Sequence, residues 1–408
     1  MNRIVFDKHS PKAFILAANH WSDAVSVDDQ VWSLVFNQSD SHPFHLYTTY
    51  GLKARLVQVY PDILSENQSL MTGDNFQSSP TVTHYSPGFL RIVCQLKSGL
   101  KLTFSAQTPE PATLLGTVSL DNLGEVDIAR TLALVFHLIP LGKGKRSHAE
   151  KIGTHHILSA QTGSLSPVLF MTGGPTVGNS PYPALSLPFQ LSPGESHSAT
   201  WVLVSRHTRE ESLKSARSVV GRSWRQLQQA QVMNHTRQTL QIQTGNPDWN
   251  AAFHLAQTIP HTHFIDLSPD QPTPVVVRNR LPDHQAISPQ LMADQDDLTA
   301  LELNHLAQVL LPQRPDLLAA LVKSRLKDCQ QDGQLFVKRN TSPFIKPYRE
   351  PPMLAGLSLE IFEVNRDQAF LETVFPMLCQ VTQPWLFTDS ESTQTRPFTW
   401  QNLDQCHL

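Results

Sequence analysis

Carboxylates in loop-like stretches of the second half of the chain are the residues best suited to chemistry. Two carboxyl groups, one protonated and one ionised, can act as acid and base on a bond held between them. The candidates are Asp294, Asp296, Asp297, Glu350, Asp389, Glu391 and Asp404. Which of them act together depends on the elements that position them.

The stretch Asp294-Gln295-Asp296-Asp297 stands directly before a predicted helix. One interpretation makes Asp296 and Asp297 hydrogen-bond acceptors for the hydroxyls of a bound ligand. The other, which we favour, makes them part of the helix start, where the positive end of the helix dipole attracts carboxylates. The stretch lacks the D-x-D-x-D-G spacing of a calcium loop.

Histidines and cysteines give no recognisable metal site. The pairs His155-His156 and His261-x-His263 have no closing ligand motif, and residues i and i+2 of a helix do not share a face. The cysteines are far apart and form no C-x-x-C motif. P-loop, dinucleotide-binding and G-x-S-x-G motifs are missing too. We therefore expect neither a metal nor another cofactor.

Composition narrows the class of partner. The 408 residues carry a net charge of -3 at pH 7, which gives no electrostatic footprint for nucleic acid or for an anionic membrane. Hydrophobic residues make up 40% of the chain, enough for a real core. We find no apolar run of membrane-spanning length and no signal peptide, so we expect a cytoplasmic protein. The oligomeric state is not predicted.

The residue pattern of the first half is typical of β-strands and predicts a large β-sandwich over residues 1–206. Short apolar stretches rich in β-branched and aromatic residues are separated by turn signals such as Gly173-Gly174-Pro175. Clear examples are Val31–Phe36, Ala54–Val59, Leu90–Leu96, Lys101–Ser105, Arg130–Ile139, Pro167–Met171 and Thr200–Val204.

The pattern changes to helices near residue 207. A linker helix is predicted over 207–234, with Thr208 and Glu211 as a capping box and with apolar residues three and four positions apart. Residues 235–408 predict about five further helices, the last of them kinked or broken at Pro376. Their ranges are Pro247–Phe264, Gln295–Leu311, Pro315–Gln330, Pro351–Asn365 and Asp367–Phe387.

These segments resemble a known family. Phe189–Val204, followed by a charged helix, resembles the last strands of the N-terminal sandwich in a group of bacterial glycoside hydrolases. Four further segments resemble the early barrel helices of that group: Leu298–Pro312, Asp332–Phe336, Pro351–Phe362 and Asp367–Pro376. The group is the six-hairpin glycosidases, with glycogen-debranching amylo-α-1,6-glucosidases, mannosylglycerate hydrolase and glycoside hydrolase family 63. The resemblance covers about residues 190–408 and rests on helix patterns, not on an active-site signature.

The resemblance implies a fold and a reaction. The fold is a β-sandwich followed by the first helices of an (α/α)6 toroid, incomplete here because a full toroid needs twelve helices. The reaction is inverting hydrolysis of α-glucosidic or related oligosaccharide bonds by two carboxyl groups about 6.5–9.5 Å apart. The general base would lie in the missing half, so this chain would be a fragment.

The resemblance also suggests residues. Trp400 and Gln405 keep the family's tryptophan and the glutamine five residues later, although Thr388–Trp400 lacks the glycines of related loops. Asp404, beside them, is our candidate acid; the alternative is a solvated carboxylate. The sugar-binding candidates are Asp296, Asp297, Arg339, Tyr348, Arg349, Glu350, Trp400 and Gln405.

The aromatic candidates have two interpretations each. Tyr348 and Trp400 could stack on a sugar ring or anchor their loops. Trp249, at a helix start, and Trp224, on the linker helix, are predicted to pack in a core or at a domain interface.

A second function from a different class stays open, namely a non-catalytic carbohydrate-binding or remnant protein. Helices of half a toroid leave apolar faces without partners. The apolar residues between Pro351 and Phe387 therefore test whether the helical part is unfinished: in that case most of them would be exposed.

Overall fold

The computed structural model describes most of the first half of the chain and six helices of the second. The described residues are 14–17, 25–26, 29–36, 43–86, 88–178, 182–224, 226–227, 229, 233, 240, 242–258, 260, 264–266, 275–276, 298–327, 335 and 352–386. The chain divides into two compact units, residues 1–258 with 282–285 and residues 259–281 with 286–408. Each unit is described by itself.

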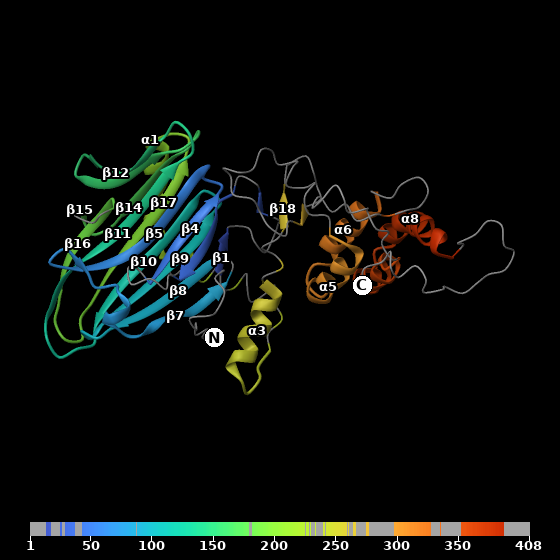
Figure 1. Cartoon of the computed structure of the whole chain (residues 1–408), viewed down its shortest axis with the longest axis horizontal. Helices are drawn as coiled ribbons and strands as arrows, with labels where there is room; N and C mark the ends of the chain where they lie inside the picture. The colour runs from blue at the N-terminus through green and yellow to red at the C-terminus, as the bar shows by residue number, and fades with distance from the viewer. Residues whose placement is uncertain are drawn as a thin grey trace, which may run out of the picture. The chain divides into compact units, whose positions relative to one another are not determined.

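Two antiparallel sheets of eight strands form a β-sandwich in the first unit (Figure 1). Sheet 1 has the order β1 (Phe14–Ala17), β3 (Val31–Phe36), β4 (Phe44–Tyr50), β5 (Ala54–Ser65), β11 (Ile128–Pro140), β16 (Ala184–Leu191) and β15 (Thr176–Val177), with β6 (Gln68–Ser69) paired to β5. Sheet 2 has the order β12 (Lys145–Ile152), β13 (His155–Gln161), β14 (Ser166–Met171), β17 (Ser196–Arg206), β10 (Thr113–Asn122), β9 (Leu100–Glu110), β8 (Phe89–Leu96) and β7 (Phe76–Ser86).

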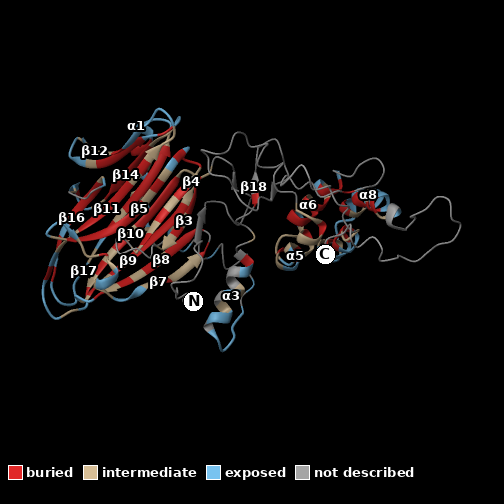
Figure 2. Cartoon of the chain, in the orientation of Figure 1, coloured by how far each residue is buried: buried red, intermediate tan, exposed pale blue. Residues whose placement is uncertain are grey.

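Strand alternation builds the core between the sheets. Every second residue of a strand faces the opposite sheet, so β9 contributes Leu100, Leu102 and Phe104 to one continuous apolar cluster. The Phe104 ring stacks on Trp201 of β17, with centroids 5.4 Å apart, and lies 5.7 Å from Phe44 of sheet 1. Figure 2 shows buried residues along the strands of both sheets.

Helix α1 (Arg209–Val220) covers part of the outer face of sheet 2 and confirms the predicted helix start. The Thr208 side chain accepts from the Glu211 amide, and the Glu211 carboxylate accepts from the Thr208 amide, which completes the capping box. Its apolar stripe packs against β10, β13, β14 and β17. Trp224, beyond the helix, packs against the same cluster, its ring 6.3 Å from that of Phe89.

Helix α3 (Pro247–Thr258) differs from the prediction in two respects. It ends at Thr258, and Phe264 begins a short strand, β18 (Phe264–Asp266), which pairs with β19 (Val275–Val276). Trp249 is 71% exposed, so a core position is wrong, while the alternative of a domain-interface position stays a prediction. Trp249 stands in the first turn of α3.

In the second unit, α5 (Ala300–Leu310), α6 (Pro315–Lys327), α7 (Leu354–Asn365) and α8 (Gln368–Leu386) contact one another. Thr299 and Glu302 form a second capping box at α5. Helix α8 runs unbroken through Pro376, so a break there is wrong, while the alternative of a kink stays a prediction. Proline removes one backbone hydrogen bond, but Phe370, Val374 and Leu378 bury one side of α8 on both sides of that position.

Most of the apolar residues that test the helical part are buried or half-buried. The buried ones are Leu354, Leu357, Ile361, Phe370, Val374 and Leu378, while Leu359 and Phe375 are 55% and 62% exposed. The described helices therefore bury most of their apolar faces. The predicted sandwich followed by helices is confirmed, and no described helix is long and apolar enough for a membrane span.

Gly116 tests the packing between the strands. A Cβ at this position of β10 would fall on the Ser105 carbonyl oxygen and on the Trp201 ring. We expect Gly116→Ala to lower the free energy of unfolding by about 1–3 kcal/mol, because neither neighbour can retreat from a filled core. Urea denaturation followed by circular dichroism measures the change in the free energy of unfolding.

The matched control is Gly356→Ala on α7, where a Cβ would meet no atom within 4 Å. This change is expected to be neutral or to stabilise by up to about 1 kcal/mol, since alanine favours helix. Equal destabilisation by both changes would contradict the packing explanation.

Candidate functional site

The site residues predicted from the sequence all lie outside the described residues. They are Asp296, Asp297, Arg339, Tyr348, Arg349, Glu350, Trp400, Asp404 and Gln405. Their roles stay predictions. His261 and His263 also lie outside the described residues, so a role for them in metal binding is not tested. The described residues instead bring together a different set of ionisable groups on the sandwich.

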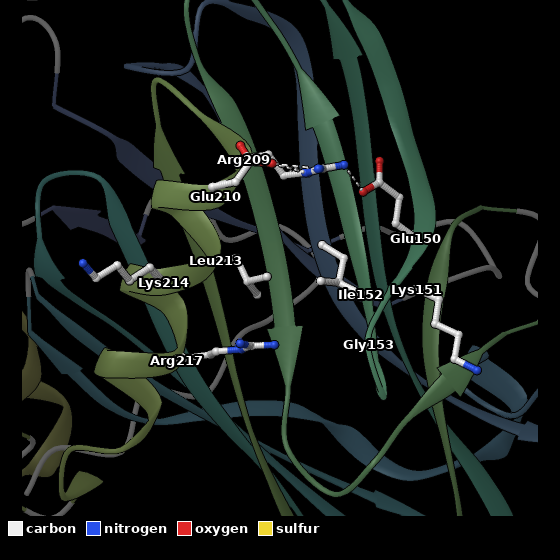
Figure 3. A pocket seen from close by; sticks show the side chains of 9 residues that line it. All are labelled: Glu150, Lys151, Ile152, Gly153, Arg209, Glu210, Leu213, Lys214 and Arg217. Carbon is white, nitrogen blue, oxygen red and sulfur yellow. Dashed lines mark hydrogen bonds and ion pairs between the residues drawn. The ribbon is translucent and has the colours of Figure 1, made fainter.

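A groove of about 780 Å³ lies between the β12–β13 hairpin and α1. Its floor is apolar, with Ile152 from the strand and Leu213 from the helix, and its walls carry four cationic and two acidic side chains. The charged lining residues are Glu150, Lys151, Arg209, Glu210, Lys214 and Arg217. Figure 3 shows Arg217 reaching from α1 toward the groove and Lys214 pointing away from it.

Arg209 links the helix to the strand through two carboxylates. Its Nη1 lies 3.0 Å from Glu150 Oε2, and its Nη2 lies 2.7 Å from Glu210 Oε1 (Figure 3). Glu150 also faces His148, whose Nε2 lies 2.8 Å from Glu150 Oε1. Arg209 is the first residue of α1 and Glu150 belongs to β12, so this network fastens the start of the helix to the edge of sheet 2.

The network keeps both carboxylates ionised. Partial burial alone would raise the pKa of the Glu150 carboxyl, but hydrogen bonds with Ser159 and His148 and the charge of Arg209 together hold that pKa below its usual value. The hydrogen bond from Arg209 likewise lowers the pKa of Glu210. A general acid that works near neutral pH needs a raised pKa. Glu150 and Glu210 therefore cannot form the acid–base pair of a glycosidase.

Ser159, His148 and Glu150 have the residue types of a nucleophile triad but not its geometry. A triad histidine uses one ring nitrogen for the serine and the other for the carboxylate. Here Ser159 Oγ, at 3.4 Å, and Glu150 both face Nε2, while Nδ1 lies 3.0 Å from the Arg146 carbonyl oxygen. His148 therefore cannot relay a proton from Ser159 to Glu150, and the cluster holds the fold together.

The other histidine pair that the sequence singled out does not gather ligands. His155 packs edge-on against Phe170, with ring centroids 5.9 Å apart, and His156 Nδ1 is buried without a hydrogen bond. Within the described ranges no three His, Cys, Asp or Glu side chains come together as metal ligands.

Sequence reasoning missed the network around Arg209. Glu150 and Arg209 are 59 positions apart, and their contact depends on the pairing of β12 with β13 and on the packing of α1. The one usable signal was the capping box at Thr208, which places Arg209 at the first helical position.

Comparison with known proteins places the fold. No family model matches the chain, and no curated protein matches it. A putative kojibiose phosphorylase from the human microbiome covers 95% of this chain with a TM-score of 0.51 and 11% identity. A bacterial glucoamylase complexed with acarbose covers 96% with a TM-score of 0.52 and 11% identity.

The chain spans 62% of the length of the first structure and 61% of the second. At 11% identity the likeness shows the fold alone: a large β-sandwich of two antiparallel sheets followed by helices.

The Glu150 network makes a prediction about stability. Glu150→Gln removes the charge that Arg209 and His148 face, so we expect the free energy of unfolding at pH 7 to fall by about 0.5–1 kcal/mol. Because the Glu150 pKa is lower in the folded protein than in the unfolded one, this contribution is lost as the pH falls below about 4.3 and through the folded pKa.

The difference between wild type and variant should therefore close in acid, as urea denaturation between pH 7 and about pH 3 would show. Glu125→Gln, at an exposed carboxylate of the sandwich, is the control and should change stability little at any pH. A Glu150→Gln difference that persists unchanged in acid would mean that the charge is not what the variant removed.

Proposed function

We propose that this chain belongs to a carbohydrate-active enzyme that cleaves α-glucosidic or related oligosaccharide bonds. The observation that carries the proposal is the order of elements, sandwich, α1 and helices, which matches two solved structures over 95% and 96% of the chain. One of those structures is named as a kojibiose phosphorylase and the other as a glucoamylase, bound to acarbose. The motifs resembling six-hairpin glycosidases support the same assignment.

The proposed chemistry is inverting attack at a glucosidic carbon. One carboxyl group protonates the leaving oxygen, and a second activates the attacking water from the opposite side of the ring. We assign the first role to Asp404. No residue is assigned to the base.

Sugar contacts are proposed for the helical half. Arg339, Arg349 and Glu350 would bind hydroxyl groups through charge-assisted hydrogen bonds. Tyr348 and Trp400 would supply stacking faces for sugar rings. Asp296, Asp297 and Gln405 would complete the hydrogen bonding, in place of or in addition to a helix-capping role for the two aspartates.

One assay decides between the enzymatic proposal and a protein that only binds carbohydrate. The chain is incubated with maltose, maltoheptaose and kojibiose, with and without inorganic phosphate. Free glucose without phosphate supports hydrolysis, whereas phosphate-dependent release of glucose 1-phosphate supports phosphorolysis. No cleavage of any of the three would refute the enzymatic proposal for this chain and leave the carbohydrate-binding alternative.

Asp404→Asn tests the assignment of the acid. We expect kcat for maltose to fall by about 10²–10⁴-fold, since the leaving oxygen then departs without a proton. For p-nitrophenyl α-glucoside the loss should be much smaller, because that leaving group needs no protonation. Steady-state kinetics on both substrates measures the contrast.

Asp389→Asn serves as the competing variant. If Asp389→Asn shows this contrast between substrates and Asp404→Asn does not, the acid is assigned wrongly.

A further inference from the structure

The outer face of sheet 1 carries a band of aromatic and neutral polar side chains, hereafter the Tyr182 band. Leu46 of β4, Val59 of β5 and Phe136 of β11 face the core, so their neighbours along each strand face outward. Strand register then sets Tyr47 opposite Gln58, and Gln58 opposite His137. The band consists of His45, Tyr47, Gln58, His137 and Tyr182.

Tyr182 provides a fixed aromatic platform. Its ring stacks on His137, with centroids 4.4 Å apart and planes 27° from parallel. Tyr182 is 42% exposed, so part of its side chain is open to solvent. The backbone beside it is held as well, since the Phe136 amide donates to the Pro183 carbonyl oxygen at 3.1 Å.

The adjoining strands offer oriented polar atoms. Gln58 Nε2 lies 3.2 Å from His45 Nε2, which sets the orientation of the carboxamide. The His45 ring meets Tyr47 edge-on, with centroids 6.5 Å apart. Among the described residues, neither Gln58 Oε1 nor the Tyr47 hydroxyl has a hydrogen-bond partner, and neither atom is sealed from solvent.

The band contains no permanently charged side chain. None of its members is a lysine, an arginine or a carboxylate. Partial burial and, next, the charge of Arg146 lower the pKa of His137, so this ring is uncharged at neutral pH. The nearest carboxylate along β5, Asp62, is buried and accepts from Ser69 Oγ at 2.6 Å. With no lysine, arginine or carboxylate among its five members, the band suits a neutral ligand rich in hydroxyl groups.

We propose that the Tyr182 band is a glycan-binding surface of the sandwich, with one sugar ring stacked on Tyr182 and neighbouring hydroxyls bound by Gln58 and Tyr47. A chain laid across the strands would meet a new side chain about every 4.8 Å, which is close to the length of one hexose residue. The ligand class, a neutral α-glucan, rests on the proposed function; the surface itself does not.

Binding of maltoheptaose to the whole chain, measured by isothermal titration calorimetry, tests the surface. Tyr182→Ala is expected to weaken binding at this surface by about five- to tenfold, because it removes the stacking face. Tyr182→Phe keeps the ring and should bind like the wild type. Val177→Ala changes another exposed apolar side chain, on β15, and should also leave binding unchanged.

Maltose cleavage by the same variants separates this surface from the cleavage site. Tyr182→Ala is expected to cleave maltose like the wild type while binding maltoheptaose more weakly. If maltose is not cleaved at all but binding still depends on Tyr182, the surface stands and the proposed reaction falls. If Tyr182→Ala binds maltoheptaose as the wild type does, or the wild type does not bind it, the surface is refuted.

Discussion

The apolar core between the two sheets is the constraint on which the other features depend. Phe104 contacts Trp201 in its own sheet and Phe44 in the opposite one, so the register of three strands is tied to one ring. Once those side chains face inward, alternation sends their neighbours outward. Outward residues of sheet 2 receive α1, and some of those of sheet 1 form the Tyr182 band. A slip of one residue in β4 or β5 would bury Tyr47 or Gln58 and dismantle that band.

The attachment of α1 shows which force dominates. Leu213, Ala216 and Val219 bury their side chains on sheet 2, and a fully buried leucine or valine contributes about 1.5–3 kcal/mol. The Arg209–Glu150 pair is partly exposed, and such pairs contribute about 0.2–1 kcal/mol. Apolar burial therefore holds the helix on the sheet. The ion pair adds a contact between the first residue of α1 and β12.

Local rules were enough to predict part of this structure. Thr208–Glu211 and the apolar stripe behind it identify α1, and alternating residues identify β8 and β9, because each signal lies within one element. Features that depend on contacts between distant parts of the sequence were not predicted. The exposure of Trp249 and the continuity of α8 through Pro376 depend on packing partners. The Tyr182 band joins positions 47, 58 and 137 only through strand pairing. The predicted cleavage residues lie outside the described residues.

The ionisable groups described on the sandwich favour a role in ligand binding over a role in bond cleavage. Cleavage of a glycoside requires two carboxyl groups whose pKa values are pushed apart. The pKa values of Glu150 and Glu210 are both lowered, in each case with a contribution from Arg209, so neither of these two carboxyl groups is suited to protonate a leaving group at neutral pH. A neutral band with one locked ring can hold a chain without reacting with it. Two sites on one polypeptide raise the effective concentration of a ligand long enough to occupy both, so the proposed surface would favour long glucans. On short substrates such a surface would have no effect, because a disaccharide cannot occupy both sites.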